Sequence, residues 1–394
     1  FKDFEYLNII IENMCKYNNS LYESTVVNIL FYCIFKIIVR SVSKMSFLSY
    51  FLSILFSQMC IMKLLLLFSL FRVVLGETFN CSTVPTTFND NRQQPTQWKL
   101  AQFNVEWLFT EPYSSCPGIC TWDTKKKQCD HLNTIKTVLE ELNADTIHLC
   151  EVQSCTQLDE VKPSNIYNSY MIKGNDTYTG QNVGLLSKID PIRTLYRTEE
   201  QFAYPMEDSQ CGYNEQGSEG VSKHLITDFL INEINIKLIG AHLLSNPNDP
   251  EACSKREAQA QVLQKTIQNA FRDNYEVILI GDLNDFDNLI PDLNNNTPNS
   301  KVLDILKGTI GDYTDYTLYS VGSLVNKMDR YTEWYDENEN CILDQSDFST
   351  LDHILVSKKL YNSIVHVDYA HIYKQSCETL QSDHYPVMVT FEFS

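Results

Sequence analysis

The sequence predicts one α/β domain whose sheets are mixed rather than wholly parallel. Strand-like and helix-like segments interleave over roughly the last 300 of the 394 residues. Several predicted strands follow one another with only a turn between them, which a wholly parallel sheet does not allow. No internal repeat and no linker-like stretch divides this region, so we expect a single domain.

The first predicted elements lie between residues 98 and 189. Residues 98–109 (WKLAQFNVEWLF) form an apolar and aromatic run that predicts a buried strand. Residues 131–142 carry apolar side chains at helical spacing and predict an amphipathic helix. Residues 145–152 (DTIHLCEV) and 181–189 (QNVGLLSKI) predict two further buried strands.

The second half of the domain repeats this mixture. Residues 223–244 predict two strands joined by a tight turn, and residues 251–272 predict a long helix. Residues 276–280 (EVILI) predict a buried strand. Residues 351–356 and 387–393 complete the set of strands.

The charge of the chain limits what it can bind. The 50 acidic and 31 basic residues give a formal net charge of -19, and 43% of the residues are hydrophobic, which is enough for a packed core. A protein that holds nucleic acid tightly through phosphate contacts usually presents a basic surface. We therefore expect no stable nucleic-acid complex, whereas an acidic enzyme that uses a divalent cation to bridge to phosphate fits this charge.

The N-terminal part predicts export. Residues 1–61 carry no usable motif, so we treat them as an unassigned extension. Met62 and Lys63 precede an apolar run that ends at Gly76, which predicts a secretory signal peptide over residues 62–76 and a domain over residues 77–394. A membrane anchor is the alternative, because the apolar run of residues 46–75 is long enough to span a bilayer.

Cysteine usage agrees with export. Ten of the 13 cysteines follow Met62, and in a secreted chain they predict disulfides. The cluster Cys116, Cys120 and Cys129 could instead bind zinc, although no CxxC pair supports that alternative. Glycosylation sequons stand at Asn80, Asn175 and Asn295. We expect a glycoprotein that is secreted or retained in the lumen of the secretory or endolysosomal pathway.

Polar side chains stand at the ends of the predicted strands, where burying an unpaired charge is costly. Each has an ordinary structural explanation by itself; a lone histidine, for example, is often a satisfied core residue. Together they form a set of carboxylate and amide oxygens with histidines, which suits Mg2+ or Mn2+ and a phosphate ester. The set is Asn104, Glu151, His242, Asp282, Asn284, Asp352, Asp383 and His384.

The order of these motifs resembles the endonuclease/exonuclease/phosphatase superfamily, which has the deoxyribonuclease I-like fold. The motifs are FNVEWLF, LCEVQ, QNVGLLSK, GAHL, GDLND, LDHILVS and SDHYPV, and the resemblance covers residues 97–394. The stretches GVSKHLITDF, LDHILVS and NVEWLF are most similar to secreted microbial nucleases of that superfamily. The resemblance implies a four-layer α/β sandwich, with two mixed β-sheets packed face to face and outer helices, and metal-dependent cleavage of phosphodiesters.

The resemblance also implies a metal site. Glu151 would be the main ligand for Mg2+ or Mn2+, with Asn104 beside it and Asp383 near the ion. Lys223, Arg330 and Tyr331 are candidates for contact with substrate phosphates, and solvated surface is their alternative role.

Five further residues would carry the reaction by the same resemblance. Asp282 and Asn284 would orient the attacking water and the phosphate, with Asp282 activating the water. Asp352 would hold the ring of His384, which acts on the scissile phosphate. His242 would contact the phosphate or protonate the leaving oxygen.

Two features depart from the superfamily's pattern. Relatives often place an acidic residue where this chain has Gln181 and Asn182, which leaves open the protonation state of His242. The stretch of residues 331–349 is expanded, and its acidic and amide residues have the odd spacing of a calcium loop. These are Asp336, Asn338, Asn340 and Asp344. Cys341 stands where such a loop has glycine, so a solvated loop pinned by a disulfide is the alternative to a structural Ca2+ site.

The sequence as a whole predicts a secreted, monomeric, Mg2+- or Mn2+-dependent phosphodiesterase with no membrane contact after signal cleavage. Nucleic acid is the expected substrate, with the enzyme acting as an endonuclease on DNA and in second place on RNA. One alternative keeps the fold and changes the substrate, as in sphingomyelinases and inositol-phosphate phosphatases. Another is a binding protein without enzymatic activity.

Overall fold

The computed structural model describes residues 81–110, 122, 124–246, 249–310, 316–336, 340–371 and 382–393. Internal contacts divide the chain into two compact units, Phe1–Gly76 and Glu77–Ser394, and every described residue belongs to the second. The predicted extension and signal peptide lie outside the described residues, as do Asn80, Cys116, Cys120 and Asn338. In the described part, no helix combines the length and the apolar character that a membrane span requires.

Two large sheets form the centre of the domain. One sheet has six strands in the order β14-β15-β1-β2-β4-β3, and the other has five in the order β10-β13-β9-β8-β7. Strands β1 and β2 pair in parallel, as do β8 and β9, whereas the other pairs within these two sheets are antiparallel. The predicted mixed character of the sheets is therefore confirmed.

The strands of the six-stranded sheet are β1 (Gln97–Leu108), β2 (Thr146–Val152), β3 (Asn168–Met171), β4 (Asn182–Ser187), β14 (Ile364–Tyr369) and β15 (Val387–Glu392). The strands of the five-stranded sheet are β7 (Lys223–Ile231), β8 (Ile234–His242), β9 (Glu276–Asp282), β10 (Leu318–Ser320) and β13 (Asp352–Ser357). Two small antiparallel ribbons pair β5 (Phe202–Tyr204) with β6 (Gly217–Glu219) and β11 (Glu333–Trp334) with β12 (Phe348–Ser349).

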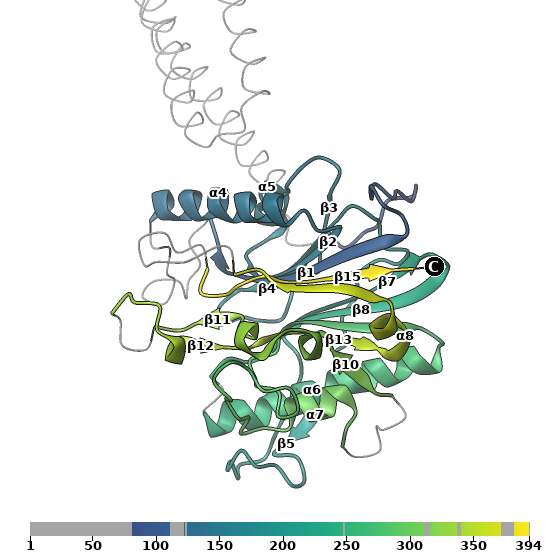
Figure 1. The fold of residues 1–394 in the computed structure, drawn as a ribbon. Helices are drawn as coiled ribbons and strands as arrows, with labels where there is room; N and C mark the ends of the chain where they lie inside the picture. The colour runs from purple at the N-terminus through teal and green to yellow at the C-terminus, as the bar shows by residue number, and fades with distance from the viewer. Residues whose placement is uncertain are drawn as a thin grey trace, which may run out of the picture. The chain divides into compact units, whose positions relative to one another are not determined.

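Helices cover the outer faces of the two sheets (Figure 1). Helices α4 (Lys125–Leu142) and α5 (Cys155–Glu160) pack on the six-stranded sheet, and α6 (Pro250–Arg272) and α7 (Val302–Lys307) pack on the five-stranded sheet. The short helix α8 (Lys358–Asn362) follows β13. The order helix, sheet, sheet, helix confirms the predicted four-layer α/β sandwich.

Successive side chains of each strand point to opposite faces of its sheet, and this alternation produces the apolar layers between the elements. In β1, Trp98 and Leu100 face the other sheet and join the central core, whereas Ala101 and Phe103 face outward and pack with α4. A strand buried on both faces reads as a continuous apolar run, because side chains alternate between two apolar layers. This explains why residues 98–109 predict a buried strand with no polar alternation.

The observed elements differ from the predicted ones in a few bounds. Helix α4 begins at Lys125 instead of residue 131, because the side chain of Thr124 caps it by accepting a hydrogen bond from the Lys127 amide. Strand β9 continues beyond residue 280 to Asp282. The edge strand β14 was not predicted, since its exposed His366 and partly exposed neighbours break the apolar pattern.

The cysteines pair only in part as predicted. Disulfides join Cys81 to Cys155 and Cys211 to Cys253, and Cys341 is also disulfide-bonded. Cys129 and Cys150 are free thiols, which corrects the expectation that every cysteine after Met62 pairs. Cys150 lies fully buried between the sheets, where it acts as a small apolar residue.

Candidate active site

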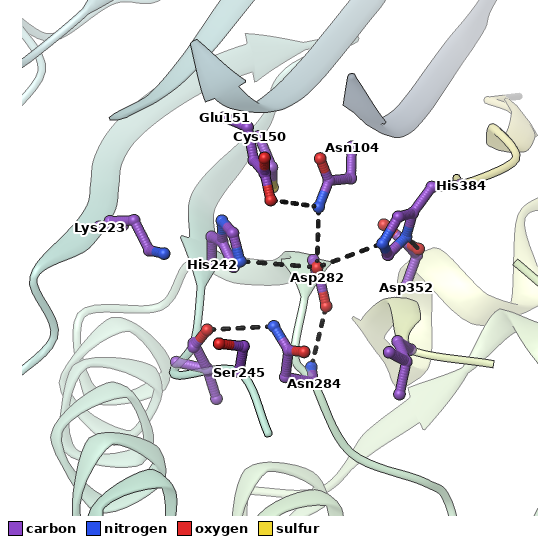
Figure 2. A network of polar contacts seen from close by, with 12 residues as sticks. Asn104, Cys150, Glu151, Lys223, His242, Ser245, Asp282, Asn284, Asp352 and His384 are labelled. Carbon is purple, nitrogen blue, oxygen red and sulfur yellow. Dashed lines mark hydrogen bonds and ion pairs between the residues drawn. The ribbon is translucent and has the colours of Figure 1, made fainter. Parts of the chain in front are cut away.

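The inward faces of several strands change from apolar to polar at one end of the sandwich. In β1 the inward series Trp98, Leu100 continues with Gln102 and Asn104, because every second residue shares a face. In β9 the series Ile278, Ile280 ends at Asp282 in the same way. Strands β2, β7, β8 and β13 follow the same rule, with polar residues His148, Lys223, His242 and Asp352 at this end. The polar side chains therefore converge from both sheets (Figure 2).

Glu151 owes its position to an irregularity in the sheet. The pairing of β2 shifts register with both β1 and β4 near this residue, and Glu151 has the positive backbone angle φ of 66°. Its carboxylate accepts hydrogen bonds from Asn104 Nδ2 at 3.2 Å and from the Trp107 amide at 3.0 Å. A left-handed backbone at a non-glycine residue is strained, and bulges of this kind commonly re-aim a side chain beside a functional site.

Asp282 lies at the centre of the cluster. Its Oδ2 atom accepts a hydrogen bond from Asn104 Nδ2 at 3.0 Å and lies 3.6 Å from His242 Nε2 and 3.9 Å from His384 Nε2. Burial raises the pKa of Asp282 to about 8 in the protein without a metal ion. A cation placed beside this carboxylate would oppose that rise.

The backbone before Asp282 requires glycine. Gly281 has φ of +155°, and a Cβ at this position would lie 1.8 Å from the backbone oxygen of Ala241 on the adjacent strand β8. Strands β8 and β9 therefore approach closely at the point where His242 and Asp282 stand opposite each other in register. The parallel pairing of β8 and β9 therefore fixes the position of His242 opposite Asp282.

His384 and Asp352 form a close buried pair. His384 Nδ1 donates to Asp352 Oδ2 at 2.6 Å, so the contact expected from the motifs is present. The backbone amide of His384 donates to Ser382 Oγ, and Ser382 Oγ donates to the backbone oxygen of Asn104. Although burial by itself would lower it, the charges of Asp352 and Asp383 raise the pKa of His384 well above its ordinary value.

His242 has the opposite environment. Its Nδ1 atom is buried and has no hydrogen-bond partner among the described residues. Burial, and next the charge of Lys223, lower the pKa of His242 well below its ordinary value, so the ring is neutral at pH 7. The amide at the position where relatives often place an acid, Gln181, accepts instead from Lys223 Nζ at 3.1 Å. Burial and the charge of Lys223 thus leave His242 uncharged.

Asn284 and Lys223 also face the cluster, whereas the side chains of Arg330 and Tyr331 contact loop residues. Asn284, with φ of 51°, donates from its side chain to the Leu243 carbonyl and from its backbone amide to Asp282 Oδ1. The Arg330 guanidinium donates to the backbone carbonyls of Val325 and Pro291, and Tyr331 stacks on the ring of His371, with 3.6 Å between the ring centroids. The phosphate contact expected of Arg330 and Tyr331 stays a prediction, because these contacts do not test it.

In the loop between β11 and β12, side-chain oxygens accept hydrogen bonds from backbone amides of the same loop. Both carboxylate oxygens of Asp336 accept backbone amides, from Asn340 and Cys341. Asn340 Oδ1 accepts the amide of Ile342. These contacts, with the disulfide at Cys341, agree with the pinned-loop alternative and do not assemble a calcium site from the described residues.

Four residues of the cluster were missed by the sequence reasoning. Glu106 Oε2 accepts the backbone amide of Asp383, and the Glu333 carboxylate is close enough to His384 to interact with its charge. Gln102 donates a hydrogen bond to Asp352, and His148 contacts Gln102. A carboxylate inside the apolar run of β1 was a usable signal for Glu106, whereas nothing in the sequence indicated the cross-strand neighbours Gln102 and His148.

The residues present fit a hard divalent cation. Burial, and next the charge of Asp383, raise the pKa of Glu151, as expected for two carboxylates that lack an adequate cationic partner. Within the described ranges, no three His, Cys, Asp or Glu side chains converge as a closed ligand set. Mg2+ does not require one, because it usually keeps several waters and binds through one or two carboxylates. Asn104 turns its NH2 group, not its oxygen, toward Glu151 and Asp282, so it bridges the carboxylates here.

No protein-family model matches the chain, and no curated protein matches it by sequence. Among solved structures, the chain is similar to a humanized zebrafish (D. rerio) TDP2, with 15% identity over 75% of this chain and 99% of that chain and a TM-score of 0.46. A truncated TDP2 from Caenorhabditis elegans gives 14% identity over 75% and 98% of the two chains, with a TM-score of 0.45.

The 3' phosphatase NExo from Neisseria, solved with a product DNA hairpin, gives 15% identity over 75% of this chain and 100% of that chain, with a TM-score of 0.49. TDP2 and NExo are members of the endonuclease/exonuclease/phosphatase superfamily, the family that the motifs of this chain resemble. At these identities the similarity concerns the fold alone, and the assignment of the fold rests on the two sheets and their covering helices.

Proposed function

We propose that the chain is a Mg2+- or Mn2+-dependent phosphodiesterase that hydrolyses nucleic acid, in the first place DNA as an endonuclease. The observation that carries this proposal is the cluster around Asp282. That carboxylate lies within 4 Å of one neutral and one charged imidazole, His242 and His384, and shares the Asn104 amide with Glu151. Acid, base and cation-binding groups thus meet at one point, as phosphoester hydrolysis requires.

Glu151, with Asp383 beside it, would hold the cation. A bound Mg2+ or Mn2+ would neutralise charge on the phosphate and lower the pKa of neighbouring acids. The Asn104 NH2 group donates to both Glu151 and Asp282 and so links the two carboxylates. Lys223, which is buried next to His242, adds one fixed positive charge for a phosphate oxygen.

The remaining residues would move protons. Asp282 would accept a proton from the water whose oxygen attacks phosphorus, while Asn284 holds the Asp282 carboxylate through its backbone amide. His384, charged and held by Asp352, would stabilise the phosphate and give a proton to the oxygen that leaves. His242 is neutral and would donate a hydrogen bond to a phosphate oxygen from Nε2. These steps break one P–O bond and form another.

Export is part of the proposal. The disulfides Cys81–Cys155 and Cys211–Cys253 agree with an oxidising compartment. The sequon residues Asn175 and Asn295 are exposed, as glycosylation requires. We keep a signal peptide over residues 62–76 and a catalytic domain over residues 77–394 as part of this proposal.

The test is a substrate comparison with the purified oxidised protein. Supercoiled plasmid, single-stranded RNA, sphingomyelin vesicles and inositol polyphosphate are each incubated with Mg2+, with Mn2+ and with EDTA. We expect nicking of the plasmid with either metal and none with EDTA. Cleavage of sphingomyelin or inositol phosphate without nucleic-acid cleavage would keep the fold's chemistry and overturn the substrate. No cleavage of any substrate by a folded protein would favour a binding function.

A further inference from the structure

A line of hydrogen bonds leads from His384 into the interior of the sandwich. His384 Nδ1 donates to Asp352 Oδ2 at 2.6 Å, and Asp352 Oδ1 accepts from Gln102 Nε2 at 2.9 Å. Gln102 Oε1 lies 2.5 Å from His148 Nδ1. Gln102, His148 and Asp352 are completely buried, so water does not compete for these bonds.

The chemistry of the groups fixes the direction of each bond. A carboxylate oxygen accepts, so Gln102 must turn its NH2 group to Asp352 and its oxygen to His148. His148 must then donate from Nδ1, which defines its tautomer. Its Nε2 atom is buried without a hydrogen-bond partner among the described residues, and burial lowers the pKa of His148 to about 3, so the ring stays neutral. Only one amide orientation of Gln102 satisfies both of its neighbours.

The position of His148 is built into both sheets. Gln102 and His148 are direct neighbours in the parallel pairing of β1 and β2, in the six-stranded sheet. Asp352 belongs to β13 in the five-stranded sheet, so the bond from Gln102 crosses between the sheets. Gly240 of β8 faces the imidazole, and a Cβ there would lie 2.4 Å from His148 Nε2. The opposite sheet therefore provides the room that the ring needs.

We propose that His148 and Gln102 are positioning residues that orient the Asp352 carboxylate and, through it, the reactive imidazole of His384. This inference rests on the proposed function, because it assigns the two residues to the same reaction. Neither side chain reaches the surface, because both are completely buried. A buried polar pair with a purely structural role would not need to end on the carboxylate that holds His384.

Loss of the His148 donor has a specific consequence. The Gln102 oxygen would lose its partner, and only the NH2 group of the amide would remain bonded, to Asp352 Oδ1 and Cys150 Sγ. A buried carbonyl oxygen without a partner is costly, so the amide would shift toward another donor or admit water. That shift would move the Asp352 carboxylate, and the His384 ring would lose its fixed orientation.

The experiment uses the full oxidised chain with supercoiled plasmid and Mg2+. The variants are His148→Leu, Gln102→Leu and His148→Asn, and Gln264→Leu is the control because Gln264 is a buried glutamine on α6. We expect kcat to fall roughly tenfold to a hundredfold in His148→Leu and Gln102→Leu with little change in KM. His148→Asn keeps an N–H donor at the position of Nδ1 and should recover most of kcat. Gln264→Leu should leave kcat unchanged.

Two further measurements separate positioning from general packing. In the Asp352→Ala background, Gln102→Leu should have no additional effect, since both changes interrupt one line of contacts. The low-field N–H proton resonance of His384, assigned by its loss in His384→Ala, should broaden or shift in His148→Leu and recover in His148→Asn. If the leucine variants do not fold, His148→Gln, whose amide reaches the Nε2 position, replaces them and should lower kcat.

Several outcomes would overturn the inference. One is an unchanged kcat together with an unchanged His384 resonance in the leucine variants. Another is an equal loss of kcat in His148→Asn and His148→Leu. A third is that Gln102→Leu lowers kcat by the same factor in the Asp352→Ala background as in the wild type. Absence of any cleavage by the wild type would instead refute the proposed function. The resonance of His384 would still decide whether His148 and Gln102 orient that ring.

Discussion

The interface between the two sheets has two parts that are built from the same strands and differ in side-chain chemistry. In the larger part, inward residues such as Trp98, Leu238 and Phe229 form a continuous apolar core. At the other end, the same inward faces present Asp282, His242 and their neighbours. In the five-stranded sheet, the pairing of β7, β8 and β9 continues without interruption from one part into the other.

The difference shows that the apolar part stabilises the fold, whereas the polar part destabilises it. Apolar side chains in the core gain about 25 cal/mol for each Å2 removed from water. The polar end instead carries costs. They include His242 Nδ1, which has no partner in the part of the chain that the structure describes, the left-handed backbone of Glu151 and the raised pKa of Asp282. Costs of this kind are expected at a functional site, and each substitution below should affect one part and spare the other.

The largest effect should come from the polar end. Glu151→Gln removes the charge that would attract the cation, so we expect the rate of plasmid nicking to fall roughly a thousandfold. The melting temperature without metal should stay near the wild-type value or rise, because a buried charge is lost. Titration with Mn2+ by calorimetry and a nicking assay measure the two consequences.

The control for this change is Glu140→Gln on the exposed face of α4. It removes the same charge from the chain and should change neither Mn2+ binding nor nicking. Retention of tight Mn2+ binding by Glu151→Gln would exclude Glu151 as the main ligand.

The apolar part should respond in the opposite way. Leu238→Ala leaves a cavity between the sheets, because Leu238 is completely buried in the central core. We expect the free energy of unfolding to fall by about 2–5 kcal/mol. The nicking rate of the folded fraction should stay within about twofold of the wild type, because this change leaves the polar end intact. Urea unfolding and a nicking assay below the melting transition test both statements, and a large rate loss with intact stability would contradict them.

A smaller effect concerns pH. His224 lies on the outer side of β7, where its Nδ1 donates to the Val221 carbonyl and its Nε2 accepts the Thr198 amide. Burial lowers the pKa of His224 to about 3, so the unfolded chain binds a proton below pH 6.5 that the folded chain does not bind. Stability is therefore lost as the pH falls below 6.5, at a rate of up to about 1.4 kcal/mol per pH unit for each such histidine.

His224→Asn should remove that share of the acid sensitivity, while His366→Asn on the exposed face of β14 should not. The unfolding free energy of each variant at pH 7 and pH 5 decides the point. The same slope in His224→Asn as in the wild type would show that His224 is protonated in the folded protein.

Much of the fold could be predicted because buried strands leave continuous apolar runs, as in residues 98–109 and 276–280. The order of strand-end motifs was enough to predict that Asp352 meets His384, since that contact follows from the fold that the motifs indicate. The pairing of Gln102 with His148 could not be predicted, because it depends on the register of two strands. The contacts of Arg330 could not be predicted either, because a basic residue near a motif carries no sign of the loop carbonyls to which it donates.

The disulfide pairing and the edge strand β14 could not be predicted from the sequence either. Pairing of Cys81 with Cys155 joins residues 74 positions apart, and only the folded sheet brings them together. Strand β14 is half exposed at the edge of its sheet, so its apolar residues are too few to indicate a strand.

We propose that the polar end of the sheet interface is a hydrolytic site. The most direct test is the single-turnover rate of plasmid nicking with Mg2+ for His384→Ala, compared with His366→Ala as a matched change at an exposed histidine. The proposal predicts a loss of roughly 10²–10⁴-fold for His384→Ala, with an unchanged melting profile, and no loss for His366→Ala. A wild-type rate in folded His384→Ala would contradict the claim, because the reaction would then proceed without the group around which the site is arranged.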